Sequence, residues 1–360
     1  GSEMCIRDRT EGDEWEESID RSDALETLDG HDGLTPEYII TRIRDAGITG
    51  MGGAGFPTYV KLTPPSTSKI DCVIINAVEC EPYITSDYRL MMEHADEILV
   101  GVKLVLMAVS APVAYIGIER NKPAAIRLFQ EKTIGERSIK IVPLEQKYPQ
   151  GGEKQLIDAV IRRQVPDPPA IPANVGTVVV NVGTAFAVYQ AVMKNKPLFE
   201  RYTSVSGKHI SQPKNFLVRM GTPISQLIDA CGGLPDGDNK IIAGGPMMGK
   251  ALMTTGVPVC KGTNSITVLS GKEAVRGGAI GPCIRCAKCV GVCPMGLEPY
   301  ILATSSAAHN WEMAEEHFIT SCIECGSCQY TCPANRPMLD NIRFGKSKVM
   351  TIIRARKQKS

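Results

Sequence analysis

The sequence predicts a protein of the α/β class, followed by a small α+β unit and a helical, cysteine-rich domain. Three observations support this. Between residues 35 and 198, short runs rich in Val and Ile alternate with segments of helical period, a pattern typical of a largely parallel sheet covered by helices. From about residue 200 the pattern changes to short β-like pieces separated by turns. Residues 275–345 then carry eight cysteines in two tight runs.

The elements of the alternating region follow in order along the chain. A helix is predicted from residue 36, with its stop at Gly47. Strands are predicted at 73–76, 140–142 and 177–181, and a helical segment at 153–163. The apolar stretch 98–118 contains Lys103 and Pro112, so a core helix followed by a strand is favoured over a membrane span. Behind them, β-like pieces at 203–207, 216–218 and 241–246 and a helix at 224–231 predict the α+β unit.

The overall composition is that of an ordinary globular protein. Lys and Arg number 40 against 39 Asp and Glu in a chain of 360 residues. A formal charge of +1 gives no general field for nucleic acid, so no nucleic-acid partner is expected. Most of the 13 cysteines lie in the two runs and the others are scattered, which favours a reducing compartment and metal ligation over secreted disulfides.

The two cysteine runs have the same spacing. Each follows the pattern C-x2-C-x2-C-x3-C-P, with the cysteines at 283, 286, 289 and 293 and at 322, 325, 328 and 332. This is the spacing of bacterial ferredoxins that bind two 4Fe-4S clusters, in which the fourth cysteine of each run ligates the other cluster. We therefore predict one cluster on Cys283, Cys286, Cys289 and Cys332, and a second on Cys322, Cys325, Cys328 and Cys293. Two zinc sites are the alternative, but they would leave the third cysteine and the proline of each run unexplained.

A glycine-rich loop spans residues 50–58, G-M-G-G-A-G-F-P-T. It contains a literal G-x-G-x-x-G, but a helix precedes it and Pro57 closes it, whereas a dinucleotide fingerprint follows a strand and opens a helix. The loop is therefore predicted to offer bare backbone to a phosphate or an aromatic ring, with a tight turn as the alternative. Lys61 follows the loop, either as a cation for a phosphate or as a plain surface lysine.

Polar side chains follow the first predicted strand. Asn76, Glu79 and Glu81 lie where α/β folds bind ligands, beyond the carboxyl end of a strand. An amide and two carboxylates there suit hydrogen bonding to ribose hydroxyls or to the edge of a flavin. A solvated acidic turn is the alternative.

Four segments together resemble the C subunit of the Rnf electron transport complex. They are residues 50–58, the stretch I-N-A-V-E-C-E-P-Y-I-T-S-D-Y-R-L at 75–90, G-G-E-K-Q-L-I at 151–157 and C-I-E-C-G-S-C at 322–328. The resemblance covers about residues 35–340. The loop and the acidic turn also resemble, more distantly, the flavoprotein subunit of respiratory complex I, which binds FMN and NADH.

The resemblance implies a complex I flavoprotein-like α/β domain, a β-grasp-like α+β domain and a two-cluster ferredoxin-like domain. It implies FMN and NADH as cofactors beside the two clusters, with Phe56 stacking near the nicotinamide or the adenine. The residues that it places at the FMN and NADH site are Gly52, Gly53, Gly55, Phe56, Lys61, Asn76, Glu79, Glu81, Glu119, Gly152, Glu153 and Asn181.

The chain departs from the family pattern in two places. Met51 stands where complex I flavoproteins have an arginine, so phosphate contacts are expected to differ. The family's N-terminal domain is expected to be missing, because residues 1–34 are predicted to be ten foreign residues followed by an acidic linker. The remaining boundaries are predicted at 35–198 for the NADH and FMN domain, 199–274 for the β-grasp-like domain, 275–345 for the cluster domain and 346–360 for a basic tail.

The leading functional hypothesis is electron transfer between NADH and ferredoxin through partner subunits of a membrane-bound, ion-translocating complex. Membrane subunits and iron–sulfur subunits of the Rnf type are the expected partners, with the chain peripheral on the cytoplasmic face of the cell inner membrane. A soluble NADH-dependent electron donor to a reductase and a ferredoxin-like wiring protein with a vestigial flavin pocket are the alternatives. The end of the chain, 343–360, holds seven Lys or Arg and no acid. It is expected to be solvated, with contact to a membrane or an anionic partner as the alternative.

Overall fold

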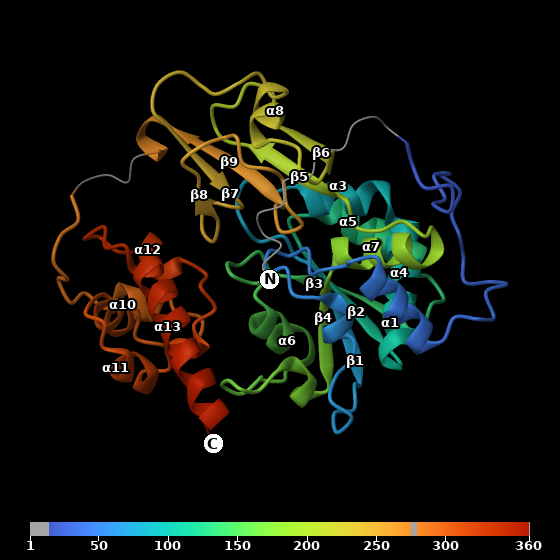
Figure 1. Ribbon diagram of the computed structural model, residues 1–360, viewed down its shortest axis with the longest axis horizontal. Coiled ribbons are helices and arrows are strands. Elements are labelled where there is room, and N and C mark those ends of the chain that lie inside the picture. The colour runs from blue at the N-terminus through green and yellow to red at the C-terminus, as the bar shows by residue number, and fades with distance from the viewer. Residues whose placement is uncertain (1–13, 275–278, 360) are drawn as a thin grey trace.

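The computed structural model describes residues 14–274 and 279–359. It has three parts, which meet near the middle of the molecule (Figure 1). The first part holds a sheet and most of the helices, the second lies above it in the figure, and the third, in orange and red, lies to one side. The predicted foreign residues at the start of the chain, Cys5 among them, lie outside the described residues.

The first part is built on a four-stranded parallel sheet. Its strands are β1 (Cys72–Ala77), β2 (Ala114–Glu119), β3 (Ile139–Leu144) and β4 (Thr177–Asn181), in the order β3-β2-β1-β4. The strands are nearly continuous in Val and Ile because helices cover both faces of the sheet. In register, Asn76 of β1 lies opposite Asn181 of β4, so both polar side chains sit at the same edge.

Helices cover the two faces of this sheet unequally. One face carries the large core with α1 (Pro36–Asp45), α3 (Ser86–Glu93), α4 (Ala95–Val109), α5 (Pro123–Lys132) and α7 (Val182–Met193). The other carries α6 (Glu153–Ile161) with a smaller core. The short α2 (Thr58–Lys61) follows the glycine loop, and a 3-10 turn spans Pro172–Val175. The prediction of a core helix and a strand within 98–118 is confirmed by α4 and β2.

The second part is a five-stranded mixed sheet with one helix. It contains β5 (Glu200–Ser206), β6 (Lys214–Arg219), β7 (Asn239–Ala243), β8 (Lys250–Ala251), β9 (Ser265–Ser270) and α8 (Ile224–Asp229), in the order β6-β5-β9-β7-β8. β9 pairs parallel with β5 and antiparallel with β7. The predicted α+β unit is therefore present, but its central strand β9 was not among the predicted strands, and a 3-10 turn at Gly271–Glu273 follows it.

The third part is helical. It contains α9 (Lys288–Gly291), α10 (Pro299–Ala307), α11 (Trp311–Glu316), a 3-10 turn at Ile319–Ser321, α12 (Ser327–Tyr330) and α13 (Met338–Lys359). The prediction of a separate tail at 346–360 is wrong, because α13 runs unbroken across residue 345. Val349 is fully buried and Ile353 packs on the same core, so helical spacing ties this stretch to the cluster domain.

Residues 14–34 contain no helix or strand. They are nevertheless attached to the first part, since the Lys194 ammonium bonds the Asp20 carboxylate. No helix within the described residues is both long enough and apolar enough to cross a bilayer.

Candidate cofactor sites

The glycine loop presents its backbone at the edge of the first part. It is closed by a bridge between Thr49 and Pro57 and is anchored where the Met51 amide donates to Thr184 Oγ1 at 2.9 Å. Gly53 and Gly55 have positive φ of 120° and 65°, and a Cβ on either would meet no atom of the described residues within 4 Å. The described part of the chain thus leaves room at both positions, at angles that favour glycine.

Two further features of the loop suit a bound cofactor. Phe56 is 49% exposed, so its ring is available for stacking. Thr58, at the start of α2, is buried, and its hydroxyl has no hydrogen-bond partner within the described residues. An open backbone cradle beside an unsatisfied hydroxyl fits a phosphorylated aromatic ligand such as FMN.

The carboxyl ends of the strands bring the predicted polar residues to this edge. Asn181 ends β4 and caps α7, and its Nδ2 donates to Asp87 at 2.7 Å. Gly52 lies beside it, since a Cβ there would sit 3.6 Å from Asn181 Cβ. Asn76, at the end of β1, donates from Nδ2 to the Gly151 carbonyl at 2.9 Å. The register of the sheet thus joins the loop at 50–58 to the loop at 151–152.

Glu79 and Asp87 form a half-buried acidic pair next to Asn181. The Glu79 carboxylate accepts from the amides of Asp87 at 2.7 Å and Tyr88 at 3.2 Å, so it caps the first turn of α3. Burial, with the nearby Asp87 carboxyl, raises the pKa of Glu79 to about 8. Burial raises the pKa of Asp87 as well. The pair therefore holds a proton near neutral pH.

Lys61 and Glu153 form an ion pair at the wall of this site. Lys61 Nζ lies 2.7 Å from Glu153 Oε1 and donates to the Val179 carbonyl at 3.0 Å. Gly152, the N-cap of α6, comes directly before Glu153. Lys61 is thus held against β4 by an ion pair and a backbone hydrogen bond.

Glu119 and Glu81 have partners within the chain. Glu119 is 2% exposed and accepts from Asn121 Nδ2 at 3.2 Å, with Lys122 Nζ at 3.5 Å. The Glu81 carboxylate accepts from the amides of Met247 at 3.2 Å and Met248 at 2.7 Å, so it joins the first part to the second. Glu119, as the last residue of β2, thus lies at the strand ends with the other predicted residues, whereas the carboxylate of Glu81 is taken up by the backbone of the second part.

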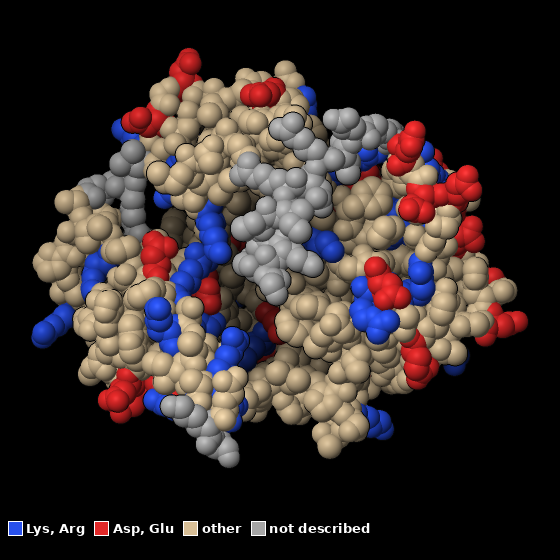
Figure 2. Space-filling model, viewed as in Figure 1, with Lys and Arg blue, Asp and Glu red and all other residues tan. Residues whose placement is uncertain are grey.

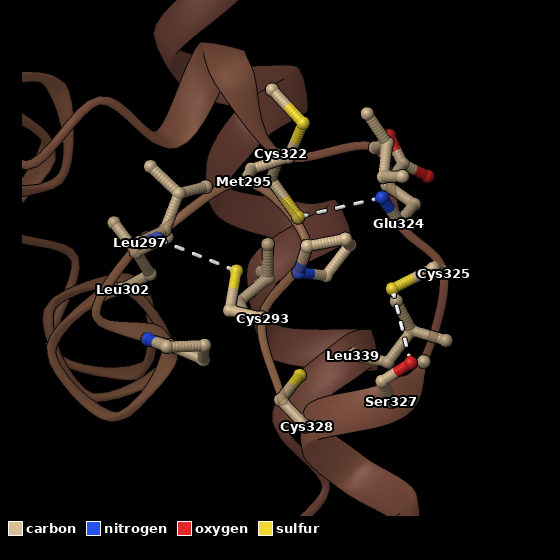
Figure 3. A pocket seen from close by; sticks show the side chains of 15 residues that line it. Cys293, Met295, Leu297, Leu302, Cys322, Glu324, Cys325, Ser327, Cys328 and Leu339 are labelled. Carbon is tan, nitrogen blue, oxygen red and sulfur yellow. Dashed lines mark hydrogen bonds between the residues drawn. The ribbon is translucent and has the colours of Figure 1, made fainter. Parts of the chain in front are cut away.

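A second site lies among the cysteines of the third part. Four cysteines line one small cavity of about 20 Å³, namely Cys293, Cys322, Cys325 and Cys328. Figure 3 shows their sulfurs around a common space, with Leu297, Leu302 and Leu339 completing an apolar lining. One cysteine of the first run therefore lies with three of the second, as the crossed assignment requires.

Backbone amides and burial both act on the sulfurs of this cavity. The amide of Leu297 donates to Cys293 Sγ and that of Glu324 to Cys322 Sγ, both at 3.4 Å. Burial raises the pKa of Cys322 to about 11 and that of Cys328 to about 12, so these thiols ionise only on binding a cationic centre.

The ligand set of this cavity suits a multi-iron cluster. Cys293, Cys322, Cys325 and Cys328 all line it, and four thiolates that each bind a different iron are the ligands of a 4Fe-4S cluster.

The remaining four cysteines lie closer to the surface. Cys283 and Cys286 are exposed, whereas Cys289 and Cys332 are half-buried. The amide of Gly281 donates to the Ala334 carbonyl at 2.9 Å, which brings the start of the first run beside the end of the second. Cys332 is thus held near Cys283.

Residues that the sequence did not single out connect the two sites. The Tyr148 hydroxyl donates to the Cys325 carbonyl at 2.6 Å, and Gln155 Nε2 donates to the Pro294 carbonyl at 3.4 Å. On the other side of the cluster loop, Lys346 bonds the Cys322 carbonyl at 2.7 Å and Glu324 at 3.0 Å. Figure 2 shows basic side chains gathered over the helix that carries Lys346, α13. Part of this basic helix therefore holds the loop of Cys322–Cys328 in place.

Arg201 and Lys122 were also not predicted as residues of the site. Both are buried, and they contact the loops that contain Met51 and Val78. Arg201 Nη2 donates to the Met51 carbonyl at 3.3 Å, and Lys122 Nζ donates to the Val78 carbonyl at 2.8 Å. These contacts join residues far apart in sequence, so no local motif carried a signal for them.

The comparisons with known proteins agree with this geometry. Three family models match in sequence: the Nuo51 FMN-binding domain at residues 43–190, the SLBB domain at 202–251 and the 4Fe-4S dicluster domain at 280–333. The C subunit of the Na(+)-translocating ferredoxin:NAD(+) oxidoreductase complex of Acetobacterium woodii is 40% identical over 97% of this chain and 81% of that protein. The chain belongs to the Rnf C-subunit family.

Other members of the Rnf C-subunit family give similar values. The C subunit of the proton-translocating ferredoxin:NAD(+) oxidoreductase complex of Clostridium ljungdahlii is 43% identical over 93% of this chain and 72% of that protein. The C subunit of the ion-translocating oxidoreductase complex of Rhodobacter capsulatus is 40% identical over 88% of this chain and 61% of its own length. A solved NAD+-reducing [NiFe]-hydrogenase has a similar fold, with a TM-score of 0.57 and 23% identity over 78% of this chain and 54% of that one.

These matches confirm the predicted family and fold class, and they confirm an FMN-binding domain with two 4Fe-4S clusters. The matched ranges fall inside the predicted domains 35–198, 199–274 and 275–345. The individual site residues stay predictions.

Proposed function

We propose that the chain is the NADH- and FMN-binding iron–sulfur subunit of an ion-translocating complex, passing electrons between NADH and ferredoxin through partner subunits. The main support is that one molecule holds both sites in contacting parts. The part that carries the glycine loop contacts the four-cysteine cavity of the third part through Tyr148 and Gln155.

FMN, when bound, supplies the conversion between two-electron hydride chemistry and one-electron transfer that iron–sulfur clusters require. The backbone of Gly52, Gly53 and Gly55 is proposed to lie against it and NADH, with the Phe56 ring stacked on the nicotinamide or the adenine. Lys61, fixed by Glu153, supplies the cation for phosphate.

The polar and acidic residues around the loop are proposed to hold the site in shape and to set its charge. Asn76 and Asn181 hold the strand ends in register, and Glu79 keeps a proton near neutral pH, which lowers the negative charge that would repel an anionic cofactor. Glu119, at the end of β2, balances the positive charge of the buried Lys122. Glu81 attaches the second part by accepting from the Met247 amide.

The cysteines are proposed to hold two 4Fe-4S clusters in the crossed arrangement. Cys322, Cys325, Cys328 and Cys293 would hold the buried one, and Cys283, Cys286, Cys289 and Cys332 the exposed one. The shared cavity supports the first set, and the contact between Gly281 and Ala334 supports the second.

The chain is proposed to be peripheral, on the cytoplasmic face of the cell inner membrane, with membrane and iron–sulfur subunits of the Rnf type as its partners. The names of the relatives, which couple ferredoxin and NAD(+) to ion translocation, support this. Co-expression with the membrane subunits tests the location: the chain should co-purify with them from membranes, and recovery as a free protein would contradict it.

Anaerobic reconstitution tests the chemistry. Purified chain supplied with iron, sulfide and FMN should bind one flavin, and NADH should bleach the flavin absorbance. Flavin that binds but stays oxidised would contradict the proposal, and a protein that binds no flavin would favour a wiring role without flavin chemistry.

A further inference from the structure

The two sets of cysteines differ in their exposure: one lies beside the first part of the molecule and the other nearer to the surface. The cavity of Cys322, Cys325 and Cys328 faces the first part through Tyr148. The loop with Cys283 and Cys286 is exposed instead. In Figure 1 the orange chain that follows residue 278 runs along the outer edge of the molecule, away from the sheet.

The surface around the exposed cysteines is apolar at its centre. Ile280, Ile284 and Tyr330 are 69%, 65% and 79% exposed. Tyr330 ends α12, two residues before Cys332, so these side chains flank the ligands of the exposed cluster on both runs. Large apolar side chains this exposed mark contact surfaces for other proteins when they cluster.

The charged residues of the first cysteine run have one sign. Residues 279–296 contain Arg285 and Lys288 and no acid. Both basic residues are exposed, and neither forms an ion pair with any other residue of the described ranges 14–274 and 279–359. An apolar centre with an unpaired basic rim complements an acidic protein surface.

We infer that the surface of Ile280, Ile284, Arg285, Lys288 and Tyr330 is the docking site for an acidic protein that carries its own one-electron centre. A single electron passes between that centre and the cluster of Cys283, Cys286, Cys289 and Cys332, with no bond formed or broken. The surface is named here the basic port. The inference rests on the proposed function for its electron source, but the binding itself does not.

The charge of the basic port would act mainly on the rate of association. Electron-transfer encounters bury less than about 1,200 Å² and dissociate quickly. Association would then depend on charge steering, which raises on-rates by about 10- to 1,000-fold and fades as salt rises.

Binding of an acidic bacterial two-cluster ferredoxin, used as a probe of this class of acidic redox protein, to the cluster-loaded full chain tests this. Both proteins are kept oxidised, so neither NADH nor electron flow is involved, and a failure of the NADH chemistry would leave the result readable. The dissociation constant is measured by calorimetry at ionic strengths of about 20 mM and about 300 mM. The double variant R285E/K288E should bind at least about tenfold more weakly at low salt, and within about threefold of the wild type at high salt.

A matched control separates the basic port from net charge. R127E/R137E makes the same change in charge at two exposed arginines in and just after α5 in the first part, neither of which forms an ion pair within the described ranges. It should leave binding within about twofold of the wild type. Equal weakening by both double variants, or by neither, would overturn the inference.

Two measurements guard against damage to the cluster loop. Iron content and the electron paramagnetic resonance spectrum of R285E/K288E should match the wild type; if they do not, R285Q/K288Q replaces it. Hydrogen exchange gives a readout without mutation: ferredoxin should protect amides within 280–292 in the wild type. Protection confined to another surface would overturn the inference.

Discussion

Gly326 is the position at which one methyl group should most disturb the contact between the cluster loop and its surroundings. It lies between Cys325 and Ser327 with φ of 78°, the left-handed conformation that favours glycine. A Cβ there would overlap the backbone carbonyl oxygen of Met247 in the loop between β7 and β8. Because that neighbour is backbone, it cannot move aside by a rotamer change.

The cost of G326A has two parts. A non-glycine residue in the left-handed region costs about 1–2 kcal/mol, and overpacking against a fixed neighbour adds about 1–3 kcal/mol. We therefore expect a loss of about 2–5 kcal/mol, concentrated at the contact between the second part and the loop that carries three of the cysteines.

Two other glycines in the same domain allow the conformational cost and the overpacking cost to be measured separately. Gly296 has φ of 65° but open space around its Cβ position, so G296A should show only the conformational part, about 1–2 kcal/mol. Gly291, at the end of α9, has neither positive φ nor a neighbour, so G291A should be neutral or slightly stabilising.

The assay is thermal unfolding of the cluster-loaded protein, combined with its electron paramagnetic resonance spectrum. The loss in melting temperature should rank G326A above G296A above G291A. Only G326A should also broaden the signal of the buried cluster. A G326A protein as stable as G296A would refute the proposed contact with Met247.

Three further predictions concern the candidate sites. If Cys293 and Cys322 ligate the same cluster, C293S/C322S should keep roughly four irons per chain, whereas C293S/C283S should lose both clusters. Because the folded pKa of Glu79 is raised to about 8 from 4.5, the folded protein holds a proton that the unfolded chain releases, so stability should fall as pH rises from about 5 to about 8, and E79Q should flatten this slope. K61M should raise the dissociation constant for FMN by about tenfold or more, measured by quenching of flavin fluorescence.

The outcomes that would contradict these predictions are specific. Equal iron contents in the two cysteine double variants would rule out the crossed ligation. Melting temperatures of E79Q and wild type that follow the same pH slope would show that Glu79 does not carry the extra proton. Lys69 is exposed and forms no ion pair within the described part of the chain, so K69M is the control for Lys61, and equal effects would remove Lys61 from the site.

The sequence predicted the parts of the fold whose signals are local. Helical period and Val-rich runs located α1, α4 and the strands β1–β4, because each depends on its own residues. The central strand β9 was missed because its place is set by pairing with β5 and β7, which precede it by many residues. The predicted basic tail is part of α13, because Val349 and Ile353 continue the apolar period of the helix beneath its basic side chains.

The candidate sites divide in the same way. Cysteine spacing is a local signal, and the cavity brings together the set that spacing predicted. The junction between the sites depends on Tyr148 and Gln155, whose contacts lie more than a hundred residues away and leave no motif. Glu81 shows the limit of a motif: it sits in the acidic turn, yet its carboxylate bonds the amides of Met247 and Met248 in another domain.

This one chain is proposed to link NADH to one-electron clusters through a flavin. The most direct measurement adds NADH anaerobically to cluster-loaded protein, with and without FMN, and follows the reduced clusters by electron paramagnetic resonance. With FMN bound, NADH should produce the signal of reduced 4Fe-4S clusters, and without FMN it should produce none while dithionite still does. Clusters that NADH reduces equally well in flavin-free protein, or that stay oxidised although the flavin is bleached, would contradict the account.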